Sequence, residues 1–140
     1  MRVRETVDVA RSPEEVYRSL TEPERGPAGA AWRDVVRDDD GYRATLQATA
    51  GPIDVEFDCR FELVERSEGE RVRIRGTGLS PRLAFAFDAQ LSVRAAGDGS
   101  VVDLDAEVLP AGSLAGMGQR RLGEQARRLV ADFVGGASSA

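Results

Sequence analysis

Residues 114 to 133 read LAGMGQRRLGEQARRLVADF, and this stretch decides the fold of the chain. Apolar and small residues recur in it at spacings of three and four, which is the pattern of one face of an α-helix. The members of this stripe are Leu114, Met117, Gly118, Leu122, Gln125, Ala126, Leu129, Val130 and Phe133. The other sides of the helix carry two adjacent basic pairs, Arg120 with Arg121 and Arg127 with Arg128. The stretch therefore predicts one long helix at the end of the chain.

The segments before this helix alternate between apolar and polar side chains, which is the period of a β-strand with one buried face. The predicted strands cover residues 3–9, 32–37, 42–50, 53–63, 71–78, 85–94 and 101–108. A sheet with one apolar face needs a cover, and the final helix is the long element able to supply it. We therefore expect an α+β fold, in which a curved antiparallel sheet of about seven strands wraps around the long C-terminal helix.

Between the first two predicted strands, the residues Ser12-Pro13-Glu14-Glu15 combine an N-cap, a proline at the first helical position and acids in the first turn. They predict a short helix, and residues 21–31 are loop-like with one weak helical turn, which makes two short helices after the first strand. We expect a single domain over residues 1–134 and a disordered tail over 135–140.

Composition removes several classes of function. The chain has 140 residues, a net charge of -5 and no histidine, lysine or asparagine. Catalytic Ser-His-Asp or Cys-His groups, a lysine Schiff base and a histidine-built zinc site are therefore excluded within one chain. The acidic balance argues against nucleic acid as a partner. The single cysteine, the polar N-terminus and the lack of a 20-residue apolar run favour a cytoplasmic protein, and we expect no cofactor and no metal.

The segment SPEEVYRSLTEP at residues 12–23 resembles the opening signature of the SRPBCC (START and birch-pollen-allergen-like) superfamily. Within that superfamily the chain resembles the family of the G subunit of carbon monoxide dehydrogenase, from residue 3 to residue 133. The segments that carry this resemblance are residues 50–53, 76–78, 102–108 and 112–122. The resemblance implies a helix-grip fold with an apolar tunnel between sheet and helix that holds a small lipophilic molecule. It also implies an accessory role for a molybdenum-containing carbon monoxide dehydrogenase, linking it to the membrane or its quinones.

The residues themselves also point to a cavity, because the inward-facing positions mix small side chains with large aromatic ones. If the helix fits tightly against the small residues the interior is filled; if it does not, an apolar gap suits a lipophilic ligand. The candidate ligand-binding residues are Trp32, Leu46, Ala48, Phe57, Phe61, Ile74, Gly76, Phe85, Phe87, Leu114, Met117, Gly118 and Leu122.

The favoured hypothesis is a non-catalytic protein that binds or carries a quinone- or isoprenoid-like molecule. Its expected partners are that ligand and a redox enzyme complex, with no nucleic acid and at most peripheral membrane contact. One alternative is an enzyme of the polyketide cyclase or hydratase type, with Glu5, Asp34 or Tyr42 as the acid–base group. Another is a structural assembly factor with a filled interior.

Overall fold

The computed structural model describes residues 1–25, 31–50, 53–67, 70–112 and 118–134. Its strands form one antiparallel sheet of seven strands in the order β1-β7-β6-β5-β4-β3-β2. The strands are β1 (Arg2–Val9), β2 (Trp32–Asp38), β3 (Gly41–Ala50), β4 (Ile53–Ser67), β5 (Arg71–Leu79), β6 (Leu83–Ala96) and β7 (Gly99–Gly112). The helices are α1 (Pro13–Thr21), the 3-10 helix η1 (Pro23–Arg25) and α2 (Gln119–Phe133). The predicted α+β helix-grip fold, with two short helices after the first strand, is confirmed; the predicted tail lies outside the described residues.

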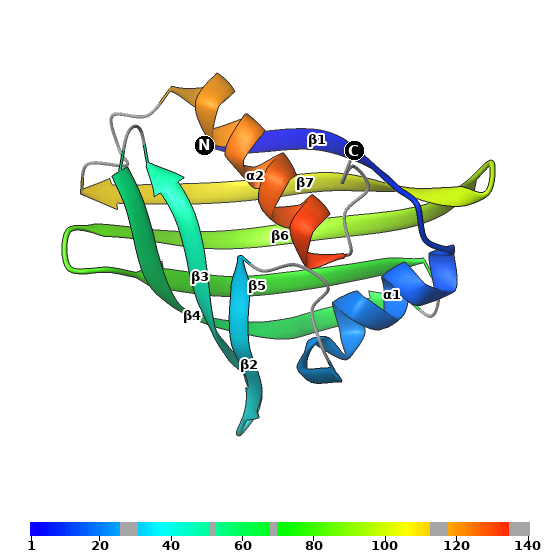
Figure 1. Ribbon diagram of the computed structural model, residues 1–140, viewed down its shortest axis with the longest axis horizontal. Helices are drawn as coiled ribbons and strands as arrows, with labels where there is room; N and C mark the ends of the chain where they lie inside the picture. The colour runs from blue at the N-terminus through cyan, green and yellow to red at the C-terminus, as the bar shows by residue number, and fades with distance from the viewer. Residues whose placement is uncertain (26–30, 51–52, 68–69, 113–117, 135–140) are drawn as a thin grey trace.

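The sheet is strongly curved, and its concave face holds α2 (Figure 1). The strands β2 and β3 turn across the long strands β5 to β7, while α2 runs diagonally over the same side of the sheet (Figure 1). Alternate residues of β1 and β7 face this side and are buried, such as Val3, Val7, Val102 and Leu104. The curvature therefore brings the two ends of the sheet toward the same helix.

Helix α1 begins as its sequence predicts. The Ser12 hydroxyl accepts a hydrogen bond from the backbone N–H of Glu15, and the Glu15 carboxylate accepts one from the backbone N–H of Ser12. This reciprocal capping box satisfies two donors at the helix start. The hydrogen bond from the backbone of Ser12 is the main cause that holds the pKa of Glu15 below its usual value. Pro13 stands in the first turn, and the helix buries Val16 and Leu20 against the sheet.

The C-terminal half of α2 is attached to the rest of the protein by polar contacts. The indole Nε1 of Trp32 donates to the carbonyl of Leu129 at 3.2 Å, and the backbone N–H of Ala31 donates to Asp132 Oδ2 at 3.1 Å. At the C-cap of the helix, Arg11 Nη1 donates to the carbonyl of Val134 at 2.8 Å. These contacts fix the helix relative to β2 and to the loop before α1.

The N-terminus of α2 differs from the prediction. Gly118 was expected on the buried stripe of the helix. In the structure it is the N-cap of α2, with an extended backbone and no side chain that could cap the helix. The helix begins at Gln119, and the predicted first turn over residues 114–117 lies outside the described residues. Glycine is tolerated at an N-cap, whereas inside a helix it is unfavourable by about 1 kcal/mol relative to alanine. The glycine therefore favours a helix that begins after it.

A β-bulge in β2 overturns one prediction of side-chain direction. Strict alternation places Asp34 on the same inward face as Trp32, but the pairing of β2 with β3 shifts register between Arg33 and Val36. Asp34 adopts a φ of 54° and is exposed, while the half-buried Val35 packs against the core. A bulge adds a residue to one strand and reverses the sense of the alternation beyond it. The inward position predicted for Asp34 is therefore wrong.

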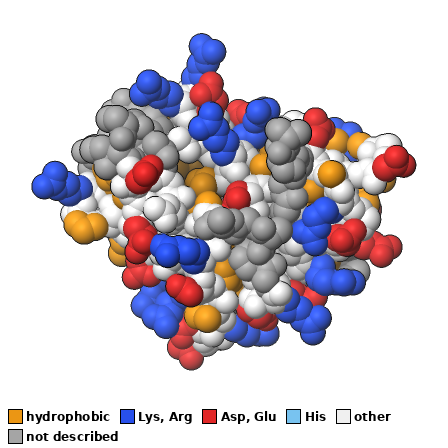
Figure 2. Space-filling view, in the orientation of Figure 1, with side chains coloured by type: hydrophobic (Ala, Val, Ile, Leu, Met, Phe, Trp, Pro, Cys, Tyr) orange, Lys and Arg blue, Asp and Glu red, His pale blue; other side chains and the backbone are white. Residues whose placement is uncertain are grey.

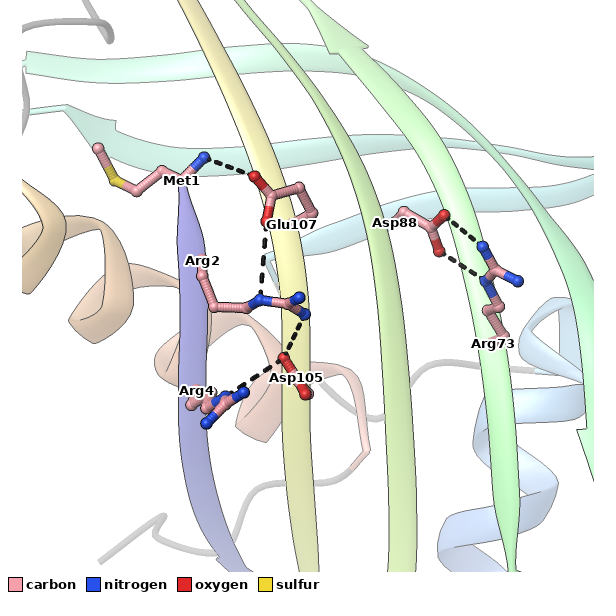
Figure 3. A network of polar contacts seen from close by, with 7 residues as sticks. All are labelled: Met1, Arg2, Arg4, Arg73, Asp88, Asp105 and Glu107. Carbon is pink, nitrogen blue, oxygen red and sulfur yellow. Dashed lines mark hydrogen bonds and ion pairs between the residues drawn. The ribbon is translucent and has the colours of Figure 1, made fainter.

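The outer face of the sheet carries ion pairs between neighbouring strands, shown in Figure 3. Arg73 and Asp88 form a bidentate pair, with an Nε–Oδ1 distance of 2.9 Å and an Nη2–Oδ2 distance of 2.8 Å. Hydrogen bonding to Arg73 holds the pKa of Asp88 below its usual value. At the sheet edge, Arg2 Nη1 lies 2.9 Å from Asp105 Oδ1, and the N-terminal ammonium lies 3.0 Å from Glu107. These groups are partly exposed, so solvent screening keeps the contribution of each pair to stability small.

Candidate functional site

A cavity of about 200 Å³ lies between the concave face of the sheet and α2. The strands supply most of its wall and the helices supply the rest. The strand residues are Trp32, Leu46, Ala48, Phe57, Phe61, Ile74, Phe85, Phe87, Ala89, Leu91, Leu104, Ala106 and Val108. The helical residues are Leu20 from α1 and Leu122, Gln125, Ala126, Leu129, Val130 and Phe133 from α2.

Short side chains contribute to this space. Ala48, Ala89 and Ala106 lie on the wall on three different strands, and Ala126 faces them from the helix. Alanine side chains stop at Cβ, so the sheet and the helix do not fill the volume between them at these positions. Of the two interiors that the sequence left open, the structure therefore has the one with an apolar gap between the helix and the sheet.

Two glycines of β5 lie beneath aromatic rings of β6. Gly76 is in register with Phe87 and Gly78 with Phe85. A Cβ atom built at Gly78 would lie 2.4 Å from the Phe85 ring, and one at Gly76 would lie 2.9 Å from Phe87 Cζ. The rings thus occupy the space that side chains at 76 and 78 would take, and they form the cavity wall there. This explains why Gly76, predicted as a wall residue, is absent from the described lining.

The aromatic side chains of the wall contact one another. Trp32 packs edge-on against Phe133 of α2, with ring centroids 5.2 Å apart, and against Phe61 at 6.4 Å. At the other end, Phe57 meets Phe85 edge-on at 5.1 Å. Edge-to-face pairs of this kind stabilise by about 0.5–1.5 kcal/mol beyond their burial. They fix the rings in place, so the shape of the cavity is defined by packed side chains.

The structure brings nine of the predicted ligand-binding residues together on this wall: Trp32, Leu46, Ala48, Phe57, Phe61, Ile74, Phe85, Phe87 and Leu122. Gly76 lies beneath Phe87, and Gly118 is the exposed N-cap of α2. Leu114 and Met117 lie outside the described residues. That these residues contact a ligand remains a prediction.

Eleven residues of the described wall are absent from the predicted ligand-binding set. The helical stripe had already singled out Gln125, Ala126, Leu129, Val130 and Phe133, and the same spacing argument would have assigned them to the site. The alternation of apolar and polar residues in β6 and β7 also placed five further wall residues on the inner face of the sheet: Ala89, Leu91, Leu104, Ala106 and Val108. No pattern in the sequence indicated that Leu20 is a wall residue. It reaches the cavity because α1 packs on the sheet.

The described wall contains no ionisable side chain, and Gln125 carries its one amide. The acid–base candidates lie elsewhere. Glu5 is half-buried beside Gly123, where a Cβ atom would lie 2.9 Å from its Oε2, and Asp34 is exposed. Tyr42 stacks on Phe61 with centroids 5.5 Å apart, and burial together with the Glu24 carboxylate raises its pKa. None of the three belongs to the described lining.

Cys59 is a buried thiol in β4, as its apolar parity predicts. Burial, with a smaller contribution from the Asp58 carboxylate, raises its pKa to about 12. The thiolate is the reactive form of cysteine, so this residue is inert in the folded protein at neutral pH. Within the described parts of the chain, no group of three His, Cys, Asp or Glu residues is placed to hold a metal ion.

The face of the molecule that carries α2 combines apolar side chains with charged side chains of both signs. Figure 2 shows hydrophobic side chains at the surface in the middle of this face, with basic and acidic side chains interspersed around its edges. The four arginines of α2 at positions 120, 121, 127 and 128 are exposed. Of the helices that the structure describes, none combines the length and the apolar character required to cross a membrane.

Comparisons with known proteins agree with this arrangement. The family model that describes the G subunit of carbon monoxide dehydrogenase (CoxG) matches residues 6–140. No curated protein matches the chain. The chain is similar to the solved structure of a conserved protein from Geobacillus kaustophilus, with 18% identity, a TM-score of 0.75, and coverage of 95% of this chain and 90% of that one.

Two further solved structures share the fold. A protein from Thermus thermophilus is 18% identical, with a TM-score of 0.62 and coverage of 96% of this chain and 94% of that one. The di-domain ARO/CYC protein StfQ from the steffimycin biosynthetic pathway is 15% identical, with a TM-score of 0.54 and coverage of 96% of this chain and 47% of that one. At these identities the likeness concerns the fold alone.

Proposed function

Because the chain belongs to the CoxG family, that of the G subunit of carbon monoxide dehydrogenase, we propose that it is a non-catalytic protein that binds or carries a small lipophilic molecule. The ligand occupies the cavity between the sheet and α2. The observation that carries this proposal is the combination of a volume of about 200 Å³ with a wall made of apolar side chains and a single amide.

The size and the polarity of the cavity support such a ligand. An apolar cavity of about 150 Å³ in another protein stays dry and binds benzene, so the larger cavity here accommodates a ring compound of greater size. Burial of apolar ligand surface stabilises the complex by about 25 cal/mol per Å² removed from water. A quinone- or isoprenoid-like molecule presents this kind of surface, and it is the specific ligand class we propose.

A non-catalytic role is favoured because the described wall offers no ionisable group. General acid–base catalysis needs a titratable side chain within hydrogen-bond reach of the reacting atoms. The alternative of a cyclase or hydratase required Glu5, Asp34 or Tyr42 at the cavity, and none of the three is part of its described wall. The likeness to the StfQ structure, at 15% identity, adds no argument for that chemistry.

The carrier role is tested by native mass spectrometry of protein purified without detergent, followed by organic extraction of the bound mass. An Ala126→Phe variant should lose the ligand because the ring fills the cavity. An Ala95→Phe variant is the matched control, since Ala95 is exposed at the end of β6. Clean apoprotein with no affinity for either 2-methyl-1,4-naphthoquinone or geraniol would refute the proposal.

We further propose that the protein serves a molybdenum-containing carbon monoxide dehydrogenase as an accessory component. The family relationship supports this partner. Surface plasmon resonance with the purified dehydrogenase of the same organism tests it, with Ala126→Phe included to separate docking from ligand binding. A lack of binding by the folded, ligand-loaded protein would exclude this partner and leave the carrier role in place.

A further inference from the structure

The cavity between the sheet and α2 offers a ligand almost no polar surface. In its described wall, the side chains that carry a nitrogen or oxygen atom are Trp32 and Gln125. The indole N–H of Trp32 donates to the carbonyl of Leu129 at 3.2 Å, and an indole has no second donor and no acceptor. Gln125 already makes an interaction within the protein. A molecule in this cavity therefore meets an almost wholly hydrocarbon surface.

The backbone around the cavity is paired as well. The strands β3 to β7, which supply most of the wall, form a continuous antiparallel ladder that uses their N–H and carbonyl groups. The wall residues of α2 lie inside a helix of 15 residues, where the backbone groups bond to one another. The sheet and the helix thus present apolar side chains to the cavity.

The two ends of an amphiphilic molecule respond to this space in opposite ways. A carbonyl or hydroxyl group that gives up water without gaining a partner weakens binding by about five- to a hundredfold. Each methylene group that leaves water strengthens binding by about fourfold. Such a molecule therefore binds best with its hydrocarbon end inside. The cavity is partly open to solvent, so the polar end keeps its water at the opening.

The volume limits how much hydrocarbon can enter. The cavity measures about 200 Å³, and an apolar cavity of about 150 Å³ in another protein holds benzene. In proportion, the space here holds about eight carbon atoms. Ala48, Ala89, Ala106 and Ala126 help to set this limit, because a longer side chain at any of these wall positions would take up part of the space.

We propose that the cavity takes up the hydrocarbon end of an amphiphilic ligand, to a depth of about eight carbon atoms, and leaves the polar group of the ligand at the opening. This inference rests on the proposed function, since it specifies which part of the ligand the same cavity binds. For an isoprenoid, the chain enters. For a fused-ring quinone, the ring that carries no carbonyl enters first. The polar group stays within reach of a redox enzyme while the hydrocarbon end is still bound.

The depth is tested with four straight-chain alcohols: 1-hexanol, 1-octanol, 1-decanol and 1-dodecanol. Isothermal titration calorimetry at neutral pH gives their dissociation constants for the wild type and for Ala126→Leu, which narrows the cavity with a good helix former. Ala95→Leu is the matched control, because Ala95 is exposed at the end of β6. Circular dichroism melts show that the comparison is made between folded proteins.

Wild type and Ala95→Leu should bind 1-octanol about tenfold more tightly than 1-hexanol, since two further methylene groups are buried. From 1-octanol to 1-dodecanol the affinity should stay within about threefold, because the added carbon atoms lie outside the cavity. In Ala126→Leu this plateau should begin at 1-hexanol. A cavity that admitted longer chains would give rising affinity over the whole series in all three proteins.

The orientation is tested with two probes that share the chain of 1-octanol. In 1,8-octanediol both ends are polar, so one hydroxyl must enter the cavity, and binding should be at least about fivefold weaker than that of 1-octanol. Octyl glucoside, used below its micelle concentration, has a head far too large for the cavity. It should bind within about fivefold of 1-octanol, because its head stays outside.

The inference is overturned if 1,8-octanediol binds as tightly as 1-octanol, if octyl glucoside fails to bind where 1-octanol does, or if affinity rises without a plateau. It also fails if the alcohols do not bind but 2-methyl-1,4-naphthoquinone does. In each of these cases binding to the cavity, and with it the proposed function, is retained. If neither the alcohols nor the quinone nor geraniol binds the wild type, both proposals fail.

Discussion

The indole N–H of Trp32 donates a hydrogen bond to the backbone carbonyl of Leu129, at an Nε1–O distance of 3.2 Å. This contact joins the edge strand β2 to the middle of the C-terminal half of α2. Both residues also line the cavity. The same pair therefore holds the helix against the sheet and forms part of the wall.

A Trp32→Phe substitution tests this role. It keeps an aromatic ring but removes the donor and part of the packing against Phe133, so we expect the free energy of unfolding to fall by about 1–3 kcal/mol. Urea denaturation followed by far-UV circular dichroism measures the change. An unchanged midpoint would mean that the hydrogen bond contributes nothing to the attachment of α2.

Alanine substitutions at the two covered glycines should have different effects. At Gly76 a Cβ atom would lie 2.6 Å from the backbone oxygen of Arg60 and 2.7 Å from Phe61 Cβ, so two strands must move apart. We expect Gly76→Ala to lower stability by about 1–3 kcal/mol. At Gly78 the close atoms belong to the Phe85 ring, a side chain that can turn.

Gly78→Ala should therefore affect binding more than stability, because a displaced Phe85 ring changes the cavity that it lines. Thermal melts and a titration with 2-methyl-1,4-naphthoquinone on both variants separate the two effects. The opposite order, with Gly78→Ala the less stable protein and Gly76→Ala the weaker binder, would contradict the assignment of the rings as covers for these glycines.

Gly123→Ala should stabilise the protein. Gly123 lies inside α2, where alanine is favoured over glycine by about 1 kcal/mol, and the atom nearest to its new Cβ is the mobile carboxylate end of Glu5 at 2.9 Å. The gain should be larger in the Glu5→Ala background, where no carboxylate has to move. Differential scanning calorimetry of the four proteins gives the coupling, and a loss of stability in both backgrounds would show that β1 itself obstructs the alanine.

The Asp88–Arg73 pair makes a stabilising contribution that depends on pH. Its hydrogen bonds lower the pKa of Asp88 from 3.8 in the unfolded chain, so the contribution is complete above that value and is lost as pH falls through the lower, folded pKa. Asp88→Asn should cost less than about 1 kcal/mol at pH 7, because the pair is partly exposed. The difference from the wild type should shrink below about pH 4.

Thermal melts of wild type and Asp88→Asn between about pH 2.5 and pH 7 measure this difference over the range in which carboxyl groups titrate. Asp98→Asn is the matched control, since Asp98 is exposed in the turn between β6 and β7. A difference that stays constant over the whole range would exclude the ion pair as its source.

Cys59 should react with thiol reagents only when the protein unfolds. Its burial raises its pKa to about 12, so at pH 8 almost no thiolate is present and the sulfur is covered by the core. Labelling with iodoacetamide, followed by mass spectrometry, should give no adduct in buffer and complete reaction in urea. Rapid labelling of the folded protein would show that β4 opens in the native state.

Much of the fold was predictable because its information is local. The period of two in the strands, the capping box at Ser12 and the helical stripe after residue 118 each follow from neighbouring residues, and all three are found. The bulge at Asp34 was not predictable from alternation, because nothing in the residues WRDVVRD announces the extra residue in β2.

The site was predictable in its composition and less so in its boundaries. Periodicity assigned Phe85 and Phe87 to the inner face, and they line the cavity. It could not show that their rings cover Gly76 and Gly78, since that depends on the register between β5 and β6.

Trp32 is the one tryptophan of the chain, and its position in the wall has a practical consequence. An indole in contact with a bound molecule changes its emission when that molecule arrives or leaves. The unmodified protein thus contains its own fluorophore at the place of interest, and occupancy can be followed in real time without labels, immobilisation or a second chromophore.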